Sequence, residues 1–411
     1  MANAEKFRRV ARRIAWKRQQ GEDVVVVVSA PGDTTDDLLE KAGELTSSPS
    51  AREMDVLLST GEQISIALLS MTLQEIGCPA ISLTGPQAGF RTDDHHRGAK
   101  ISHIDTRRIK QELAEGKVVI VAGFQGLDQR GDITTLGRGG SDASAIALAA
   151  YLEADHCQIF SDVDGVYTSD PRLVPTAARL DEISYDEILE LAAAGAQVMQ
   201  LRSVEFAKQY GVEFEVLSSL APLPNEGGVE QGTKVVAALS PHNNRVVSGV
   251  AVDSKVARIT LLGLPDRPGV AARVFGALGK AKVNVDMIVQ SAGTVANGSP
   301  NADIAFTCTR DDLDLALEVC QEVLTVFPGT QLVYDIDVAK VSIVGSAVAS
   351  NYGVAATMFE ALANTGVNIE LITGSEIKIS CLVRASQAVD ALRAVHDKFE
   401  LGKSAVPVSG K

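Results

Sequence analysis

Short aliphatic runs alternate with stretches of helical periodicity along the first 200 residues. The chain opens with an amphipathic pattern that predicts a helix from about Asn3 to Gln20. The β-branched run Val24–Val28 then predicts a strand buried on both faces. The same patterns predict helices at 62–77, 105–115, 142–150 and 185–194 and strands at 80–84, 118–122 and 156–161. Such alternation predicts an α/β domain with a largely parallel sheet.

The pattern changes near Leu220. Residues 221–228 are rich in proline and glycine, which predicts a loop or linker. Beyond it lies an internal repeat, in which residues 256–263 match 338–345, 269–272 match 353–356 and 283–286 match 367–370. Each copy predicts the order strand, glycine turn, helix, strand, strand, helix, which is that of a small ferredoxin-like α+β unit.

Composition narrows the function. Of 411 residues, 52 are acidic and 38 basic, so the formal charge of −14 argues against a broad nucleic-acid surface. The five cysteines are scattered and form no CxxC, so we expect neither a disulfide framework nor a zinc site. We expect the protein to occupy a reducing cytoplasm. The longest aliphatic run, Val24–Ala30, is too short to span a bilayer, and the charged start does not resemble a signal peptide. We therefore expect a cytoplasmic protein without a membrane partner.

The densest glycine segment is Thr134–Asp142, which contains Gly137, Gly139, Gly140 and Arg138 and precedes a helical run. Glycines let backbone amides approach an anion, and the helix N-terminus adds a favourable dipole. Arg138 adds a donor for a carboxylate or phosphate. The alternative is a simple capped loop with Ser141 or Asp142 as the N-cap.

Three further polar segments stand out. Ser161–Tyr167, continued by Asp170 and Arg172, follows a predicted strand, where two acids can hold Mg²⁺ beside phosphate oxygens; an acidic turn is the alternative. Ser59–Gln63 is predicted to open a helix. The glycine-bearing loop Thr84–Asp93 follows a predicted strand, a usual place for substrate contacts.

These segments, together with Val28–Asp36, occur in the order seen in aspartate kinases, and the repeat resembles the tandem ACT domains of that family. The resemblance implies an amino-acid-kinase fold, with three α/β/α layers around a mainly parallel sheet, followed by two ACT domains. Its domains would be 1–235, 250–330 and 338–411, and the last strand could return to the first ACT unit. The implied reaction transfers the γ-phosphoryl group of ATP to the side-chain carboxylate of L-aspartate, a step toward lysine, threonine and methionine.

The resemblance also implies roles for single residues. Ser29 and Thr35 would lie near the substrate, Glu62 would hold its amino group, and Arg138 would clamp its carboxylate. Gly139, Gly140 and Ser141 would line the phosphoryl site, with Arg138 and Asp162 as catalytic residues. ATP, carried as its Mg²⁺ complex without a separate metal site, would contact Ser161, Asp162, Tyr167, Arg172 and Gln197. The acceptor carboxylate is ionised near neutral pH, so no general base is required.

The repeat is expected to be a sensor. In the first copy a helix N-terminus can hold an amino acid's carboxylate while Asp266 holds its ammonium group. In the family, positions on the two copies surround inhibitory lysine, threonine or both; here they are Asp266, Gly269, Val270, Asn284, Asp286, Gln290, Asn351, Gly353, Val354, Asn368 and Glu376. We expect at least a homodimer through the ACT units. The alternative is that the repeats only dimerise the enzyme.

Two departures from the family pattern bear on activity. The family begins with a strand ending in Lys-Phe/Tyr-Gly-Gly, whose lysine stabilises the transferring phosphoryl group, and we expect that strand to be missing here. The family often has Gly-Ala-Lys near the nucleotide, where this chain has Gly195-Ala196-Gln197. Losing one electrostatic stabiliser typically costs about 10²–10³ in rate. We therefore expect a weak or inactive catalyst, and the alternative function is an amino-acid-sensing regulatory subunit.

Overall fold

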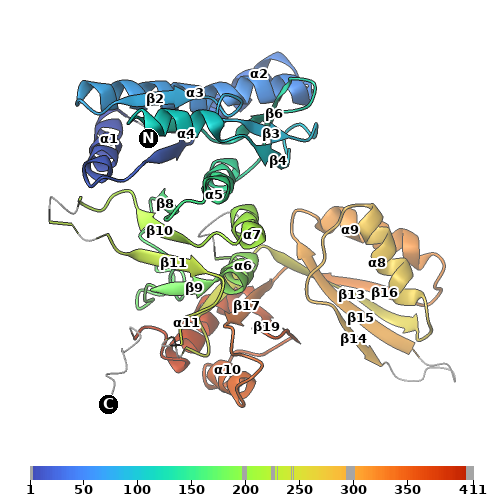
Figure 1. Ribbon diagram of the computed structural model, residues 1–411. Coiled ribbons are helices and arrows are strands. Elements are labelled where there is room, and N and C mark those ends of the chain that lie inside the picture. Colours follow the sequence, from blue (N-terminus) through green and yellow to red (C-terminus); the bar gives the residue numbers. More distant parts are fainter. Residues whose placement is uncertain are drawn as a thin grey trace, which may run out of the picture. The chain divides into compact units, whose positions relative to one another are not determined.

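A computed structural model describes residues 3–196, 201–223, 227–228, 230–241, 243, 245–292 and 301–403 (Figure 1). The chain divides into two compact units. Unit 1 comprises Met1–Val166, Asp181–Tyr185 and Val198–Leu239, and unit 2 comprises Tyr167–Leu180, Asp186–Gln197 and Ser240–Lys411. Unit 2 therefore combines the repeat with two short segments from the first half of the sequence.

A parallel sheet of order β1-β5-β2 forms the centre of the N-terminal part of unit 1. Its strands are β1 (Val25–Val28), β5 (Val118–Ala122) and β2 (Ala80–Leu83). All five residues of β5 are fully buried. The prediction that the valine run would be buried on both faces is wrong for most of β1, because β1 lies at the edge of this sheet and only Val28 is buried.

Helices cover both faces of this sheet, which confirms the three-layer arrangement. On one face α1 (Ala4–Gln19) and α3 (Ala51–Glu75) pack on Val28, Val118 and Ile120. On the other face α4 (Arg107–Ala114) and α5 (Gly140–Leu152) pack on Val119 and Val121. The predicted N-terminal helix is present as α1, and α2 (Thr34–Leu45) packs against α3.

Two four-stranded sheets complete unit 1. The first has the order β4-β3-β6-β7, and its strands are β4 (Ile101–Ile104), β3 (Phe90–Thr92), β6 (Gln125–Leu127) and β7 (Ile133–Thr135). The second has the order β8-β10-β11-β9, and its strands are β8 (Gln158–Ser161), β10 (Phe214–Ser218), β11 (Gly232–Val236) and β9 (Glu182–Ser184). Helix α7 (Leu201–Tyr210) packs on α5. Buried Arg13 of α1 donates to the carbonyl oxygens of Ser218, at 3.1 Å, and Ala221, at 2.8 Å, and so ties α1 to the second of these sheets.

The repeat forms two α+β units inside unit 2, as predicted. The first copy contains β13 (Val256–Pro265), α8 (Val270–Lys280), β14 (Val289–Ala292), β15 (Asn301–Thr309), α9 (Leu313–Leu324) and β16 (Gln331–Asp335). The second contains β17 (Val338–Val344), α10 (Val354–Asn364), β18 (Leu371–Gly374), β19 (Lys378–Arg384), a 3₁₀ turn (Ala385–Gln387) and α11 (Ala388–Lys398). Its fourth strand is β12 (Gly249–Asp253), which precedes the first copy and pairs antiparallel with β17. Helix α6 (Tyr185–Ala193) contributes to the same unit, where Glu187 accepts from Ser248 Oγ and Ser346 N.

Helix α3 corrects one prediction. It begins at Ala51, so Ser59–Gln63 lies in the middle of the helix and does not open it. Gly61 suggests a helix boundary in the sequence but has a packing role: an added Cβ would lie 2.8 Å from Ala30 Cβ. By length and composition alone α3 could cross a membrane, yet half of its most apolar stretch is buried within this protein.

Two glycines on neighbouring helices test this packing. Gly61→Ala should lower the free energy of unfolding by about 1–3 kcal/mol, because the new methyl group meets Ala30. Gly43→Ala in α2 should raise it by up to about 1 kcal/mol, because nothing among the described residues lies within 4 Å of an added Cβ there. Urea unfolding of both variants measures the difference, and stabilisation by both would contradict the close approach of α3 to Ala30.

Candidate active site

The carboxyl ends of the three parallel strands meet at one edge of the β1-β5-β2 sheet. Ser29 and Ala30 follow β1, Gly123 follows β5 and Gly85 follows β2. In open α/β sheets this edge is where ligands bind. The N-terminus of α5 lies against it, because an added Cβ at Gly123 would be 2.9 Å from Ser141 Cα and 2.8 Å from Val27 Cγ1. Only glycine fits at position 123 without a shift of its neighbours.

The glycine segment enters α5 by a left-handed turn. Gly139, with φ of 70°, is the N-cap residue, and the helix begins at Gly140. Among the described residues no side chain caps this helix, so the alternative that Ser141 or Asp142 is the N-cap is wrong. Ser203 Oγ of α7 donates to Gly139 O at 3.1 Å and holds the turn. The amide of Gly140 donates to Gly137 O at 3.0 Å, so among the first amides of α5 that of Ser141 is the one suited to an anion.

Glu62 places a carboxylate beside the same edge. Its side chain is only 3% exposed, and Oε1 accepts from Ala30 N at 3.0 Å. Oε2 is buried and has no hydrogen-bond partner among the described residues. Burial raises the pKa of Glu62 to about 7, although the hydrogen bond from Ala30 acts in the opposite direction. A cationic ligand group placed at Oε2 would restore the ionised form.

The other residues predicted for aspartate lie around this edge. Ser29 is exposed directly after β1, and Thr35 is in the first turn of α2, where Thr34 Oγ1 donates to Pro31 O at 2.5 Å. Arg138 is exposed between Gly137 and Gly139. Burial raises the pKa of Asp142 in the first turn of α5. The substrate residues predicted from three separate segments therefore all belong to unit 1.

The residues predicted for ATP are divided between the units. In unit 1 Ser161 ends β8, and its Oγ donates to Asp162 Oδ1 at 3.0 Å. In unit 2 Tyr167 forms an isolated bridge with Arg179, and the guanidinium of Arg172 is held by Asp170 at 2.7 Å. Gln197 lies outside the described residues.

The first repeat copy has a cavity of about 370 Å³ at the N-terminus of α8. Four residues predicted for the effector line it: Asp266, Gly269, Val270 and Gln290. Asn284 and Asp286 precede β14, the strand that carries Gln290, and the carboxylate of Asp286 is paired with the ammonium of Lys340.

The second copy repeats the turn without the acid. Gly353, with φ of 88°, is the N-cap of α10, which begins at Val354. Asn351 Nδ2 donates to Ala347 O at 2.8 Å. The loop also contacts Glu376, whose carbonyl accepts from Ala349 N at 3.0 Å, while Asn368 lies before β18. The two copies are therefore chemically different.

Sequence reasoning missed three contributors to this site. The Ala30 amide holds Glu62, Gly123 admits α5, and Asp55 on α3 accepts a hydrogen bond from Thr135 Oγ1 at 2.5 Å. A glycine directly after a fully apolar strand was a usable signal for position 123. Nothing local distinguishes Asp55, because its partners are distant in the sequence.

Comparison with known proteins matches each half of the chain to a protein family. The amino acid kinase family model matches residues 1–218, and an ACT domain model matches 259–324 and 341–399. The aspartokinase of Corynebacterium glutamicum is 47% identical over 98% of this chain and 94% of its own length.

Solved structures of E. coli aspartokinase III show the same fold. The complex with aspartate and ADP, called the R-state, has a TM-score of 0.74 and 24% identity and covers 97% of each chain. The complex with lysine and aspartate, called the T-state, has a TM-score of 0.69 and 24% identity and covers 95% of this chain and 96% of that one.

Glu62→Gln tests the buried carboxylate. The folded-state pKa of about 7 exceeds the ordinary 4.5, so the folded protein binds more protons between these values and loses stability as pH rises through them. Glutamine does not titrate, so the variant should gain up to about 3 kcal/mol in free energy of unfolding at pH 8, shrinking toward pH 5. Urea titrations across this range measure it, with exposed Glu53→Gln on the same helix as control. An equal change in both variants would contradict the burial argument.

Proposed function

Because this chain belongs to the aspartokinases of the amino acid kinase family, we propose that the edge formed by β1, β5 and α5 binds L-aspartate beside the γ-phosphate of ATP. The enzyme phosphorylates the side-chain carboxylate of aspartate and produces 4-phospho-L-aspartate, because the similarity to aspartokinases over 98% of the chain supports this reaction over the alternative of an amino-acid-sensing regulatory subunit. E. coli aspartokinase III, which shares the fold, binds aspartate and ADP.

The buried carboxylate of Glu62 is the observation that carries this assignment. Its Oε2 atom lacks a partner among the described residues, and an α-ammonium group would supply the cationic donor. Arg138 would then clamp the α-carboxylate, with Ser29 and Thr35 beside it. A site with a buried acid and an exposed arginine matches the two opposite charges of a free amino acid.

Catalysis in this proposal is positioning with charge neutralisation. The acceptor carboxylate is already ionised, so no side chain has to remove a proton. The α5 dipole and the amide of Ser141 would stabilise negative charge on the transferring phosphoryl group, beside the turn that Gly139 and Gly140 form. Holding the two reactants in this geometry removes much of the entropic barrier.

ATP would lie beyond the end of β8, against Ser161 and Asp162 of unit 1. Among the described residues no three acidic, histidine or cysteine side chains gather to hold a metal ion. Mg²⁺ would be carried by the phosphates of ATP, in agreement with its preference for phosphate oxygens and water, and Asp162, which follows β8, is the carboxylate that would bind it.

An ADP-release assay with aspartate, and with glutamate as the comparator, tests the reaction. We expect turnover with aspartate only. Arg138→Lys should raise KM for aspartate by about 10-fold or more, because lysine cannot form the bidentate contact, while KM for ATP changes little. Arg130→Lys, on the exposed turn between β6 and β7, is the control. Phosphorylation of glutamate at a similar rate, or an unchanged KM in Arg138→Lys, would refute the assignment.

We further propose that the first ACT unit binds a free amino acid as a feedback inhibitor. The α8 N-terminus would hold its carboxylate and Asp266 its ammonium group, with Gln290 across the cavity. E. coli aspartokinase III binds lysine, which makes lysine the first candidate and threonine the second. Allosteric coupling of this kind is typically worth about 1–3 kcal/mol.

We also propose that the ACT units pair to form a homodimer. Strand β16 is an edge strand with Val333, Tyr334 and the adjoining Ile336 exposed, as expected for a surface that a second copy covers.

Calorimetric titration of lysine and of threonine, each with and without the other, tests the effector site. We expect Asp266→Asn to weaken binding by about 10-fold or more, because it removes the charge opposite the ammonium group. Asp314→Asn, exposed at the start of α9, should have no effect. Equal affinity of wild type and Asp266→Asn would place the effector elsewhere.

A further inference from the structure

We propose that Asp55 is a positioning residue that fixes the aspartate-binding turn at Gly137 and Arg138. The assignment rests on the proposed role of that turn in binding aspartate. Asp55 does not contact the strand ends itself. It acts through a loop, residues 95–98, that packs against the turn.

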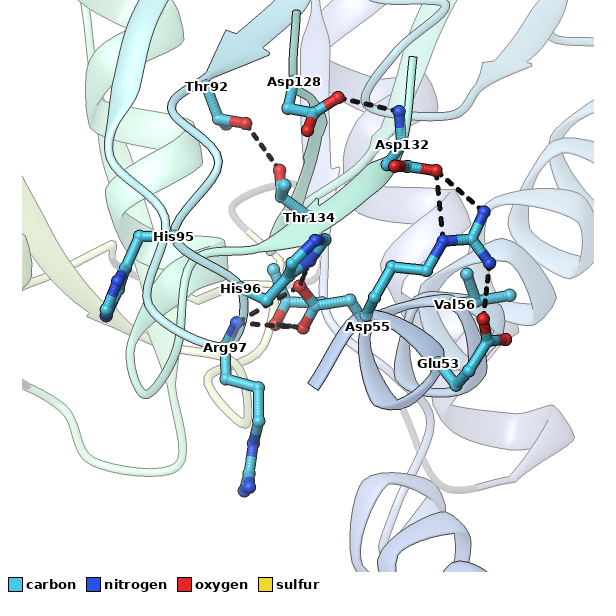
Figure 2. Close-up of polar contacts among 12 residues, drawn as sticks. Glu53, Asp55, Val56, Thr92, His95, His96, Arg97, Asp128, Asp132 and Thr134 are labelled. Carbon is cyan, nitrogen blue, oxygen red and sulfur yellow. Dashed lines mark hydrogen bonds and ion pairs between the residues drawn. The ribbon is translucent and has the colours of Figure 1, made fainter. Parts of the chain in front are cut away.

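The carboxylate of Asp55 joins three segments (Figure 2). Asp55 lies in α3, and its side chain is fully buried. It accepts from Thr135 Oγ1 at 2.5 Å, from Arg97 N at 3.1 Å and from His96 Nδ1 at 2.7 Å. Helix α3, the 95–98 loop and strand β7 therefore meet at one buried group. Donors left unpaired in a buried place are costly, so a carboxylate that accepts from three residues anchors the segments that carry them.

The anchored loop carries a backbone that needs support. Arg97 has φ of 65°, in the left-handed region that non-glycine residues seldom adopt. Such a conformation is strained and persists only where its surroundings fix it. Figure 2 shows the Arg97 amide facing Asp55 while its side chain extends away. The amide contact with Asp55 is thus the interaction that holds this conformation.

The loop in turn shapes the substrate turn. The carbonyl oxygen of Arg97 lies 3.0 Å from the position of an added Cβ at Gly137, so the loop rests directly on the Gly137 backbone. Ala99, which directly follows the loop, donates from its N to Thr135 O at 3.0 Å, and this hydrogen bond extends the contact between the loop and the turn. Gly137 has φ of 79°, and its carbonyl accepts from Gly140 N at 3.0 Å.

Arg138 lies between Gly137 and Gly139. Helix α7 holds the turn and the loop from another side. Arg202 donates to Leu136 O and, at 2.7 Å, to Ala99 O, so the turn and the loop are clamped as one body. If Asp55 releases the loop, the Gly137 backbone gains room and Arg138 loses its fixed direction. Misplacing a clamp by about 1 Å is enough to cost a large factor in substrate use.

Matched variants separate this role from ordinary stabilisation. Thr135→Val removes only the hydroxyl that donates to Asp55. Its control is Thr134→Val in the same strand, β7, which removes a hydroxyl that contacts Thr92 Oγ1 of β3 at 2.6 Å. Asp55→Asn removes the anchor charge. Its control is Asp128→Asn, which removes a buried carboxylate that accepts from Arg130 N and Asp132 N but contacts neither the loop nor the turn.

The first measurement is steady-state kinetics of the full chain. We expect Asp55→Asn and Thr135→Val to raise KM for aspartate about 5- to 10-fold, with KM for ATP within about twofold of wild type. The two controls should keep both KM values, whatever their melting temperatures. Equal KM for aspartate in Thr135→Val and Thr134→Val would overturn the proposal, even if Asp55→Asn fails to fold.

The second measurement does not depend on activity. Amide hydrogen exchange of peptides covering 134–141 should speed up in Asp55→Asn and Thr135→Val and stay unchanged in the controls. Unchanged exchange in Thr135→Val would also overturn the positioning role. If wild type does not turn over aspartate, the proposed function fails, while the exchange comparison still decides whether Asp55 fixes the turn.

Discussion

The contact between the Glu62 carboxylate and the Ala30 amide sets the geometry on which the rest of unit 1 depends. To reach that amide, α3 must approach the end of β1 closely, and Gly61 permits this because it has no side chain to meet Ala30. The approach removes Glu62 from water, which raises its pKa to about 7 and leaves Oε2 without a partner among the described residues. A helix that carries such a group inside a core is less stable than one with a neutral side chain. The site therefore gives up folding stability to keep a carboxylate available for a cation.

Glycines also permit close packing at β5 and α5, the other two elements of the site. Gly123 lets β5 end against Ser141, and an added Cβ at Gly140 would lie 2.8 Å from Phe124 Cδ2. Three elements can then converge, and Ser141 at the start of α5 lies where β5 ends. Amides fixed by a helix and a sheet do not reorganise as charge develops, which is what phosphoryl transfer requires of its surroundings.

The hydrophobic periodicity of the sequence was sufficient to predict elements whose buried positions recur regularly. Strand Val118–Ala122 and the repeat's order of elements were predicted correctly because each segment's own pattern dictates its structure. Prediction failed where a residue distant in the sequence determines the local structure. The start of α3 was placed near Gly61, whose actual role is to let the helix pack against Ala30. Strand β12 pairs with the second ACT unit although the first ACT unit lies between them in the sequence. The substrate residues were found by motif resemblance, whereas Asp55 depends on partners at positions 96, 97 and 135, which no local window contains.

The two ACT copies show how one repeat can take on different roles. In the first, Asp266 lines a cavity, whereas the carboxylate of Asp286 is paired with the ammonium group of Lys340 of the second copy. In the second, the matching turn has Asn351 in hydrogen-bond contact with Ala347 and carries no acid. Charge pairs also join the copies, since Arg258 contacts Glu370 at 2.7 Å and Arg384 contacts Asp335 at 2.8 Å. A ligand that moves β13 would have to move Arg258 with it. The proposed effector in the first copy is therefore connected to the second by ion pairs whose geometry it would alter.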